Sequence, residues 1–176
     1  MRRVRYSVAA SLDGYIAGPE GEYDWIIMDP DIDFGALTRR FDTLLIGRRT
    51  FEGMTQKGQG GPLFGMKTLV FSHTLDPTDH PSVDVLGEGA EEELRRVRSE
   101  PGKDIWLFGG GLLFRSLLAA NLVDSVEVAI IPVVLGGGIP LVPAPAAQAQ
   151  LELTSHNVYP KTGTVFLDYA ISRTQS

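Results

Sequence analysis

Three consecutive glycines, Gly109 to Gly111, separate two apolar segments, and the second of these is long enough for a helix. Glycine loses more backbone freedom on folding than any other residue, so such a run makes sense where something must approach the backbone closely. A helix start presents unpaired N–H groups and the positive end of a dipole, which together suit a phosphate. The run and the amide of Leu112 are therefore predicted to cradle a diphosphate. The alternative is a tight turn that only packs a helix on a sheet.

Two further apolar segments end in polar groups of the kind that bind phosphates. Gly47 closes one segment and is followed by Arg48, Arg49 and Thr50, and the next segment ends in Ser72-His73. Cations at a helix start oppose the helix dipole, so a nearby anion explains the arginines better than a solvated pair does. In open parallel sheets, ligands lie outside the carboxyl ends of the strands. The three segment ends are therefore expected to line one nucleotide site.

Composition limits the kinds of protein that this chain can be. It has 176 residues, a net charge of −6 and no basic block, so nucleic acid is not an expected partner. It has no cysteine, which excludes thiol catalysis and cysteine-ligated zinc, and its three histidines are not at metal-ligand spacing. No metal site is expected. No apolar run suits a signal peptide or a membrane helix, so a cytoplasmic location without a membrane partner is expected.

Apolar periodicity predicts strands that alternate with helices through the first two thirds of the chain. Buried strands are expected at residues 4–11, 42–47, 67–71, 105–108 and 123–134, and a terminal hairpin at 151–157 and 164–171. The first helix is expected to use one apolar face made by Ile32, Phe34, Leu37 and Phe41. This order predicts one α/β domain over residues 1–176. It would be a three-layer α/β/α structure with a mostly parallel central sheet and an antiparallel C-terminal hairpin.

Six short segments carry a family resemblance in their order along the chain. They are Ser11–Ala17, Asp24–Ile26, Leu45–Phe51, Val70–Ser72, Phe108–Gly111 and Pro132–Gly138. Together they resemble the dihydrofolate reductase fold, and more closely the riboflavin-biosynthesis reductase (RibD C-terminal) domain and its stand-alone relatives. A standard dinucleotide-binding Rossmann fingerprint does not fit, because the triple glycine lies late in the chain and no acidic residue ends the next strand.

The resemblance implies an oxidoreductase that uses NADPH to reduce a flat nitrogen heterocycle, such as a pteridine or a ribosylaminopyrimidine. By resemblance, the adenosine phosphates lie at Gly47, the diphosphate lies at the triple glycine, and the nicotinamide lies against small residues near the first strand. The cofactor-binding residues implied in this way are Ala10, Ala17, Gly18, Gly47, Arg48, Arg49, Thr50, Ser72, His73, Gly109, Gly110, Gly111, Leu112 and Phe114.

The substrate is expected between the first strand, the long loop that follows it and the first helix, because the nicotinamide must point there. The implied substrate-binding residues are Ser11, Asp13, Trp25, Asp33, Leu37 and Phe51. The proton would come from water or from Asp13, Asp31 or Asp33. As alternatives, Asp31 and Asp33 could cap a helix, and Asp13 could belong to a tight Asp-Gly turn.

Two other functions fit the same residues. One is a nucleotide-binding module without turnover, and the other is a plain dihydrofolate reductase, which needs a carboxylate that faces the pterin. A homodimer is expected, because the long strand and the terminal hairpin carry more apolar side chains than one small domain covers. These side chains are Val126, Val128, Ile130, Val133, Val134, Val165, Leu167 and Tyr169. Gly110 is expected to have a positive φ angle.

Overall fold

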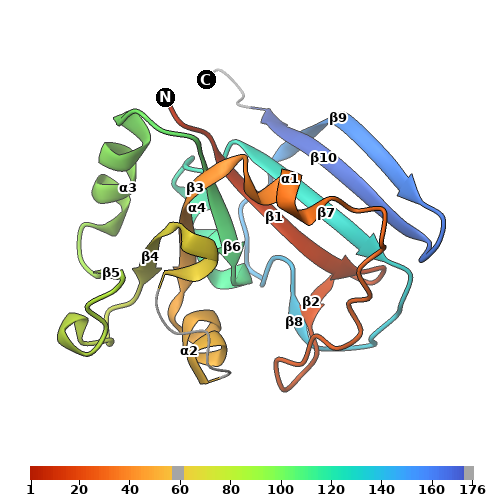
Figure 1. Cartoon of the computed structure of the whole chain (residues 1–176), viewed down its shortest axis with the longest axis horizontal. Coiled ribbons are helices and arrows are strands. Elements are labelled where there is room, and N and C mark those ends of the chain that lie inside the picture. Colours follow the sequence, from red (N-terminus) through yellow and green to blue (C-terminus); the bar gives the residue numbers. More distant parts are fainter. Residues whose placement is uncertain (57–61, 173–176) are drawn as a thin grey trace.

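The structure is a computed structural model and describes residues 1–56 and 62–172. Its centre is an eight-stranded sheet with the order β5-β4-β3-β6-β1-β7-β10-β9 (Figure 1). Neighbours from β5 to β7 pair in parallel, and β10 and β9 add to them in antiparallel fashion. The fold class expected from the sequence is therefore confirmed. The strands are β1 (Val4–Ser11), β3 (Phe41–Gly47), β4 (Lys67–Phe71), β5 (Asp84–Leu86), β6 (Asp104–Gly109), β7 (Ser125–Ile131), β9 (Gln150–Tyr159) and β10 (Thr164–Ser172).

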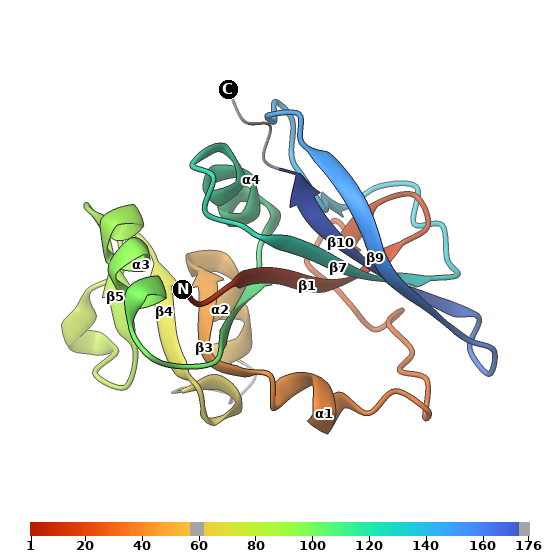
Figure 2. The same cartoon turned by 90° about the horizontal axis from the view of Figure 1, so that it is seen from above.

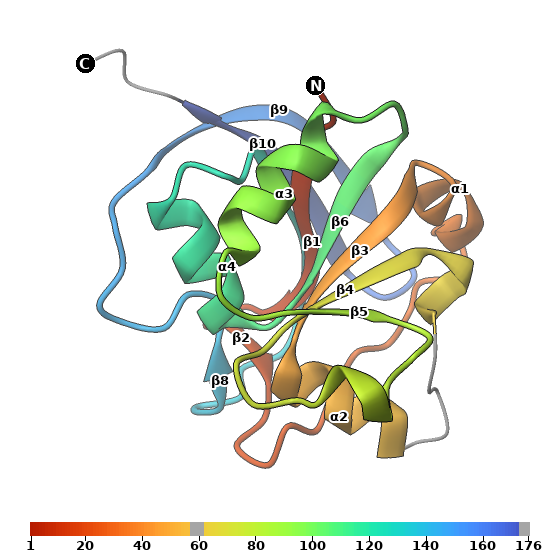
Figure 3. The same ribbon diagram turned by 90° about the vertical axis from the view of Figure 1, so that its left-hand side faces the viewer.

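Helices cover both faces of the sheet because apolar side chains alternate along the central strands. On β3, Leu45 belongs to the core on one face, whereas Leu44 and Ile46 belong to the core on the other. The helices α3 (Ala90–Ser99) and α4 (Gly111–Ala119) pack on the first face, and α1 (Phe34–Thr38) and α2 (Arg48–Gln56) pack on the second. Figure 2 shows α1 and α4 on opposite sides of the sheet, and Figure 3 shows α3 in front of it. We call the side that bears α1 the α1 face.

The first helix is shorter than the sequence pattern predicts. The Asp33 carboxylate accepts a hydrogen bond from Ala36 N at 2.7 Å and so caps a helix that begins only at Phe34. Phe41 lies outside the helix, because it begins β3 and pairs with Asp104 of β6. The expected apolar face from Ile32 to Phe41 was therefore wrong in its extent. Within the described ranges, no helix has the length and apolarity needed to cross a membrane.

The long loop before α1 is tied to the turn between β9 and β10. Asp29 is fully buried, and its carboxylate accepts hydrogen bonds from the N–H and the hydroxyl of Thr162, each at 2.9 Å. Lys161 forms an ion pair with Asp31 at 2.6 Å. These contacts join residues far apart in sequence and fix the loop against the end of the sheet. The remaining short elements are β2 (Tyr15–Ala17), which pairs with β8 (Ile139–Pro140), and the 3-10 helices at Leu63–Gly65 and Pro77–Asp79.

Candidate functional site

The sheet divides between β1 and β6 toward the carboxyl ends of these strands. Their pairing joins residues 4–6 to residues 105–107 and then stops, although β1 stays paired with β7 as far as Ser11. β6 continues to Gly109, where it still pairs with Ile46 of β3. Figure 1 shows β1 and β6 diverging below the level at which they pair. These two strand ends no longer pair with each other, and we call them the fork: residues 7–11 of β1 and 108–109 of β6.

Trp106 ends the pairing at the start of the fork. Ile105 N donates to Arg3 O at 2.8 Å, and the two-residue repeat of a parallel ladder would bring Gly109 N opposite Ser7 O. Instead the indole Nε1 of Trp106 donates to Ser7 O at 3.0 Å. The indole is almost fully buried, so this hydrogen bond is shielded from water. Trp106 thus occupies the acceptor that would continue the ladder.

Gly47 joins β3 to α2, and Gly109–Gly111 join β6 to α4; we call these two segments the glycine junctions. They meet on the β6 side of the fork. A Cβ atom on Gly47 would lie 3.7 Å from both Gly109 O and Gly110 N, and a Cβ atom on Gly110 would lie 3.3 Å from Thr50 Oγ1. Gly110 is the N-cap of α4, and no described side chain caps the N–H groups of its first turn. These donors therefore suit an anion, and Gly47 and the Thr50 hydroxyl lie beside them.

The glycines of the run serve different ends. Gly110 has φ −97° and ψ −174°, so the expectation of a positive φ angle was wrong: the chain passes this point in an extended conformation. Glycine is favoured at this position by the limited space beside Thr50 and not by the sign of the φ angle. A Cβ atom on Gly111 would lie 2.6 Å from Pro140 O, so Gly111 is required by packing against the β8 segment. The peptide bond between Gly109 and Gly110 is cis.

Cations and a hollow lie next to the junctions. Arg48 Nη1 is 3.1 Å from both carboxylate oxygens of Glu52, and Arg49 is exposed and forms no ion pair within the described part of the chain. A hollow of about 420 Å³ lies between the ends of β4 and β5, the start of α3 and the middle of α4. Ser72 and His73 are among the residues that line it. The Ser72 hydroxyl accepts from two backbone N–H groups and keeps its proton for a further acceptor.

Asp13 joins the turn after β1 to the segment before β8. Its carboxylate accepts hydrogen bonds from Ser11 Oγ at 2.7 Å, Leu135 N at 3.1 Å and Gly136 N at 2.8 Å. These bonds, with that from Ser11 the largest contribution, lower the pKa of Asp13 to about 2. Asp13 is therefore ionised at neutral pH and holds two loops together at the tip of the fork.

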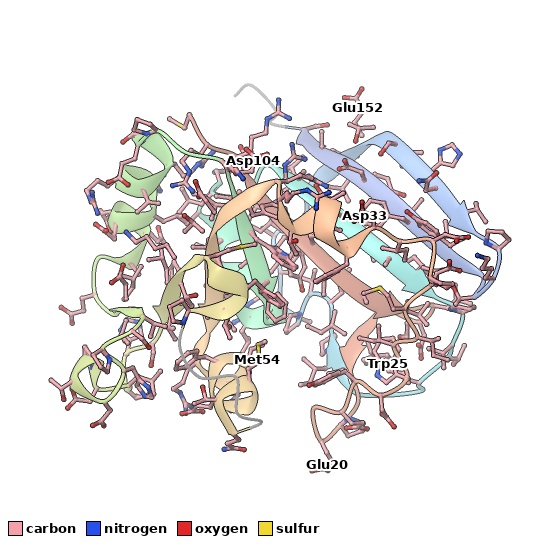
Figure 4. All side chains as sticks on the ribbon, in the orientation of Figure 1. Glu20, Trp25, Asp33, Met54, Asp104 and Glu152 are labelled. Atoms are coloured by element: carbon pink, nitrogen blue, oxygen red, sulfur yellow. The ribbon has the colours of Figure 1, made fainter. Side chains whose placement is uncertain are left out.

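The other two aspartates expected to donate a proton also have partners. Asp31 is half-exposed and pairs with Lys161. Asp33 caps α1, which was the alternative interpretation of this residue, and it lies 3.6 Å from Arg39 on the surface. Figure 4 shows Asp33 at α1 and Trp25 in a different region, near β2. The structure therefore does not bring these two expected substrate residues together.

The remaining expected residues divide between surface and core. Trp25 donates its indole N–H to Glu22 O at 3.2 Å, whereas Phe51 is 2% exposed and lies in the α1-face core with Leu37. Among the expected cofactor residues, Phe114 is buried and stacked on Tyr6. Of the other expected cofactor residues, Leu112 is half-exposed and Ala10 and Gly18 are buried. Ala17 lies against the backbone of Gly138.

An aromatic cluster that the sequence reasoning missed covers the α1 face beside the fork. Phe64 stacks on Trp106 with 5.4 Å between ring centroids, and Phe34 and Phe108 contact both rings. Phe64 is 46% exposed and has φ 56°, a left-handed conformation that costs energy for a bulky residue. The backbone of Phe64 is thus held in a strained conformation, although nearly half of the residue is exposed to solvent. Trp106 and Phe108 lie together on β6, but Phe34 and Phe64 come from other elements, so no single local motif marked the four rings.

A buried acid, Glu127 of β7, was also missed. It is fully buried on the α1 face, where two arginines contact it. The available signal was a single carboxylate inside an otherwise apolar strand, because such a group must find partners when the strand is buried.

Comparison with known proteins gives three findings. The profile of the RibD C-terminal domain matches residues 2–165. The uncharacterized protein YyaP of Bacillus subtilis (strain 168) is 38% identical over 151 residues, which is 80% of this chain and 80% of that protein. A candidate riboflavin biosynthesis protein from Shewanella sp. PV-4 has a TM-score of 0.81 at 24% identity, over 98% of this chain and 100% of that chain.

A second solved structure extends the likeness of fold. Dihydrofolate reductase from Enterococcus faecalis, in complex with NADP(H), has a TM-score of 0.70 at 21% identity, over 97% of both chains. The resemblance drawn from the six sequence segments is thereby confirmed at the level of family and fold.

Proposed function

The chain belongs to the RibD C-terminal domain family, and we propose that it is an NADPH-dependent reductase that transfers a hydride to a flat nitrogen heterocycle. The observation that carries this proposal is the meeting of Gly47, Thr50 and the uncapped start of α4 at one side of the fork. Backbone N–H groups and a hydroxyl converge there on a space that suits a diphosphate. When bound, NADPH supplies the hydride.

The residues near the junctions fit the adenosine half of NADPH. Arg49 has no ion-pair partner in the described part of the chain, and Arg48 shares its charge with one partly exposed glutamate, Glu52. Both can turn toward the 2′-phosphate, for which a guanidinium is well suited. The hollow at Ser72 and His73 has room for the adenosine, and the Ser72 hydroxyl offers it a donor. These features favour NADPH over NADH.

The fork fits the nicotinamide end. The unpaired backbone edges of β1 and β6 lie next to the junctions, so a flat ring placed there has backbone on two sides. Ala9 faces the α1 side at this point, because its neighbours Val8 and Ala10 belong to the core on the opposite face. The aromatic cluster beside the fork gives the substrate ring an apolar surface, which suits a flat heterocycle.

The proposed substrate is either a pteridine or a ribosylaminopyrimidine. An example of the latter is 5-amino-6-(5-phosphoribosylamino)uracil. Asp13 is a poor proton donor at neutral pH because its pKa is lowered to about 2. Asp31 and Asp33 remain candidates only if they leave Lys161 and the α1 N-terminus. Water, which was the other source expected, needs no such rearrangement.

We also propose a homodimer formed through β9 and β10. Residues 150–158 of β9 are all exposed, and among them are Leu151, Leu153 and Val158. Across the hairpin, Val165 pairs with Val158 and Tyr169 pairs with Leu153, which extends the apolar surface onto β10. A second copy would cover this surface and the open edge of β9. A single-chain mass by light scattering at micromolar concentration would exclude the dimer.

Loss of NADPH absorbance tests the reductase function directly. The purified protein is mixed with NADPH and, separately, with dihydropteridines, dihydrofolate and 5-amino-6-(5-phosphoribosylamino)uracil. At least one heterocycle should oxidise NADPH at a rate proportional to protein concentration. Tight NADPH binding without turnover on any of them would support the alternative of a nucleotide-binding module. Turnover on dihydrofolate alone would support a plain dihydrofolate reductase.

A further inference from the structure

Glu127 is a fully buried carboxylate in which one oxygen accepts hydrogen bonds and the other accepts none from the described residues. Arg5 Nη1 donates to Oε1 at 3.0 Å, and Arg40 Nη2 donates to the same oxygen. Among the described residues, Oε2 has no hydrogen-bond partner. A buried acceptor without a donor costs about 1–3 kcal/mol, and more when it is charged. This oxygen is therefore placed to accept a donor from a bound molecule.

Glu127 lies one strand away from the fork. It pairs with Ser7 of β1, the residue at which the fork begins. Its contact with Arg40, which follows α1, places its side chain on the α1 face. The next residue of β7 on that face, Ala129, lies about 7 Å further along the strand and pairs with Ala9. Both alanines are partly exposed, so a small apolar strip beside the fork leads directly to the carboxylate.

A hollow at the start of β7, on the side of Glu127 away from the fork, is lined by a second polar group without a partner in the described part of the chain. Asp168 pairs with Glu127 across β7 and β10. Burial, and then the charge of Glu127, raise the pKa of Asp168. Arg5, Asp168 and Ser125 line a hollow of about 400 Å³, and the buried Ser125 hydroxyl has no partner among the described residues. This cluster therefore lacks hydrogen-bond partners at two atoms.

Arg40 is the more easily displaced of the two cations on Glu127. Its side chain is 37% exposed, whereas that of Arg5 is 16% exposed and is also held by Asp104 at 2.6 Å. Arg40 belongs to the short link between α1 and β3, so it can move without disturbing the sheet. If Arg40 leaves, Arg5 still neutralises Oε1 while Oε2 accepts another donor.

We propose that Glu127 binds the N–H-bearing edge of the substrate ring, an inference that rests on the reductase function proposed above. The ring lies on Ala9 and Ala129 beside the fork, and Oε2 accepts a hydrogen bond from an amino or ring N–H group. Arg40 moves aside, and Arg5 stays on Oε1. The substrate class is therefore a heterocycle with N–H donors at the edge remote from the bond that is reduced.

A matched pair of ring compounds tests this inference by binding alone. NADPH-loaded protein is titrated with 2,4-diaminoquinazoline, which carries N–H donors, and with quinazoline, which has the same rings without them. The wild-type protein should bind the diamino compound at least about ten-fold more tightly, as one charge-assisted hydrogen bond allows. Glu127→Gln should remove most of this preference while the affinities for quinazoline and NADPH stay the same.

Two further variants separate recognition from stability. Asp104→Asn removes the other carboxylate on Arg5 and should leave the preference intact. Arg40→Met removes the arginine that must move aside from Glu127, so it should increase the preference for the diamino compound. This result tests the inference even if Glu127→Gln does not fold. A folded Glu127→Gln with the wild-type preference would overturn the inference, as would a wild-type protein that does not distinguish the two compounds, or an Arg40→Met variant with no gain. Absence of NADPH binding in the same titration would instead count against the reductase function.

Discussion

The two sides of the fork are built in different ways. On the cofactor side, the proposed groups come from short runs at strand ends, in which neighbours in sequence are neighbours in space: Gly47–Thr50, Ser72–His73 and Gly109–Gly111. On the substrate side they come from single residues: Phe34, Phe64, Trp106 and Glu127 lie on separate elements. Backbone N–H groups at a helix start bind phosphate whatever the side chains are, whereas a ring needs particular side chains brought together by the fold. Substrate choice can therefore vary while the cofactor side stays the same.

The largest expected effect is on the cofactor side. Gly110→Val places a branched side chain against Thr50, because even the Cβ atom would lie only 3.3 Å from Thr50 Oγ1. The added methyl groups should keep the proposed diphosphate away from the first turn of α4. Loss of two charge-assisted hydrogen bonds would weaken NADPH binding by roughly 100-fold or more. Isothermal titration of NADPH measures this effect.

Gly53→Val is the matched control for this prediction. Gly53 lies on α2, and a Cβ atom there would meet nothing within 4 Å. This variant should bind NADPH like the wild type. A folded Gly110→Val protein with wild-type affinity would show that the glycine run serves packing alone.

The arginines at the start of α2 should contribute a smaller but selective effect. Arg48→Ala is expected to weaken NADPH binding by about 1–3 kcal/mol, the range for a charge-assisted contact. NADH, which lacks the 2′-phosphate, should bind the variant and the wild type equally. Arg49→Ala tests the neighbour that has no ion pair in the described structure. If both variants weaken NADH as much as NADPH, the arginines do not recognise the 2′-phosphate.

Trp106 connects the two sides, and its hydrogen bond can be removed with little change of shape. Trp106→Phe loses the donor to Ser7 O, so Gly109 N can continue the ladder and narrow the fork. Unfolding in urea should show a loss of about 1–3 kcal/mol if Ser7 O stays unpaired, and less if the ladder closes. In the second case kcat should fall. Phe41→Leu, which alters a ring stacked on Trp106 and spares the hydrogen bond, is the control. An unchanged stability and kcat in Trp106→Phe would contradict this account of the fork.

The smallest effects are those of pH on stability, and they have opposite signs at Asp13 and at Asp168. The lowered pKa of Asp13 means that its contribution is present above the unfolded pKa of about 3.9 and is lost as pH falls toward 2. Asp13→Asn should therefore be less stable than the wild type at neutral pH, with a difference that shrinks below pH 4. Thermal unfolding across this pH range measures it. A difference that is constant with pH would rule out the ionised carboxylate as the cause.

Asp168 should behave in the reverse manner. Its raised pKa, due first to burial and then to the charge of Glu127, means that ionisation costs stability above that pKa. Asp168→Asn should therefore gain stability at neutral pH, and the gain should fade as pH falls and the wild-type carboxyl becomes protonated. A loss of stability at neutral pH would mean that Arg5 and Arg40 compensate Asp168 more fully than its burial suggests.

This contrast also explains what could be predicted from the sequence. The parallel sheet, the hairpin and both glycine junctions follow from local patterns: apolar runs, glycine at segment ends and polar residues after them. The length of α1 did not follow, because the cap at Asp33 and the pairing of Phe41 with β6 decided it. Asp13 and Asp31 were candidates for proton transfer because carboxylates look alike in sequence. Asp13 is held partly by the nearby Ser11, but another donor at Leu135 and the partner of Asp31, Lys161, lie more than 100 residues away.

The central claim is that the glycine junctions bind NADPH, and titration of the wild-type protein with NADPH and with NADH tests it most directly. We predict saturable binding of one NADPH per chain and at least about ten-fold weaker binding of NADH, since the 2′-phosphate adds a charge-assisted contact. Equal affinities would contradict the assignment of the arginines. The absence of saturable NADPH binding would contradict the central claim.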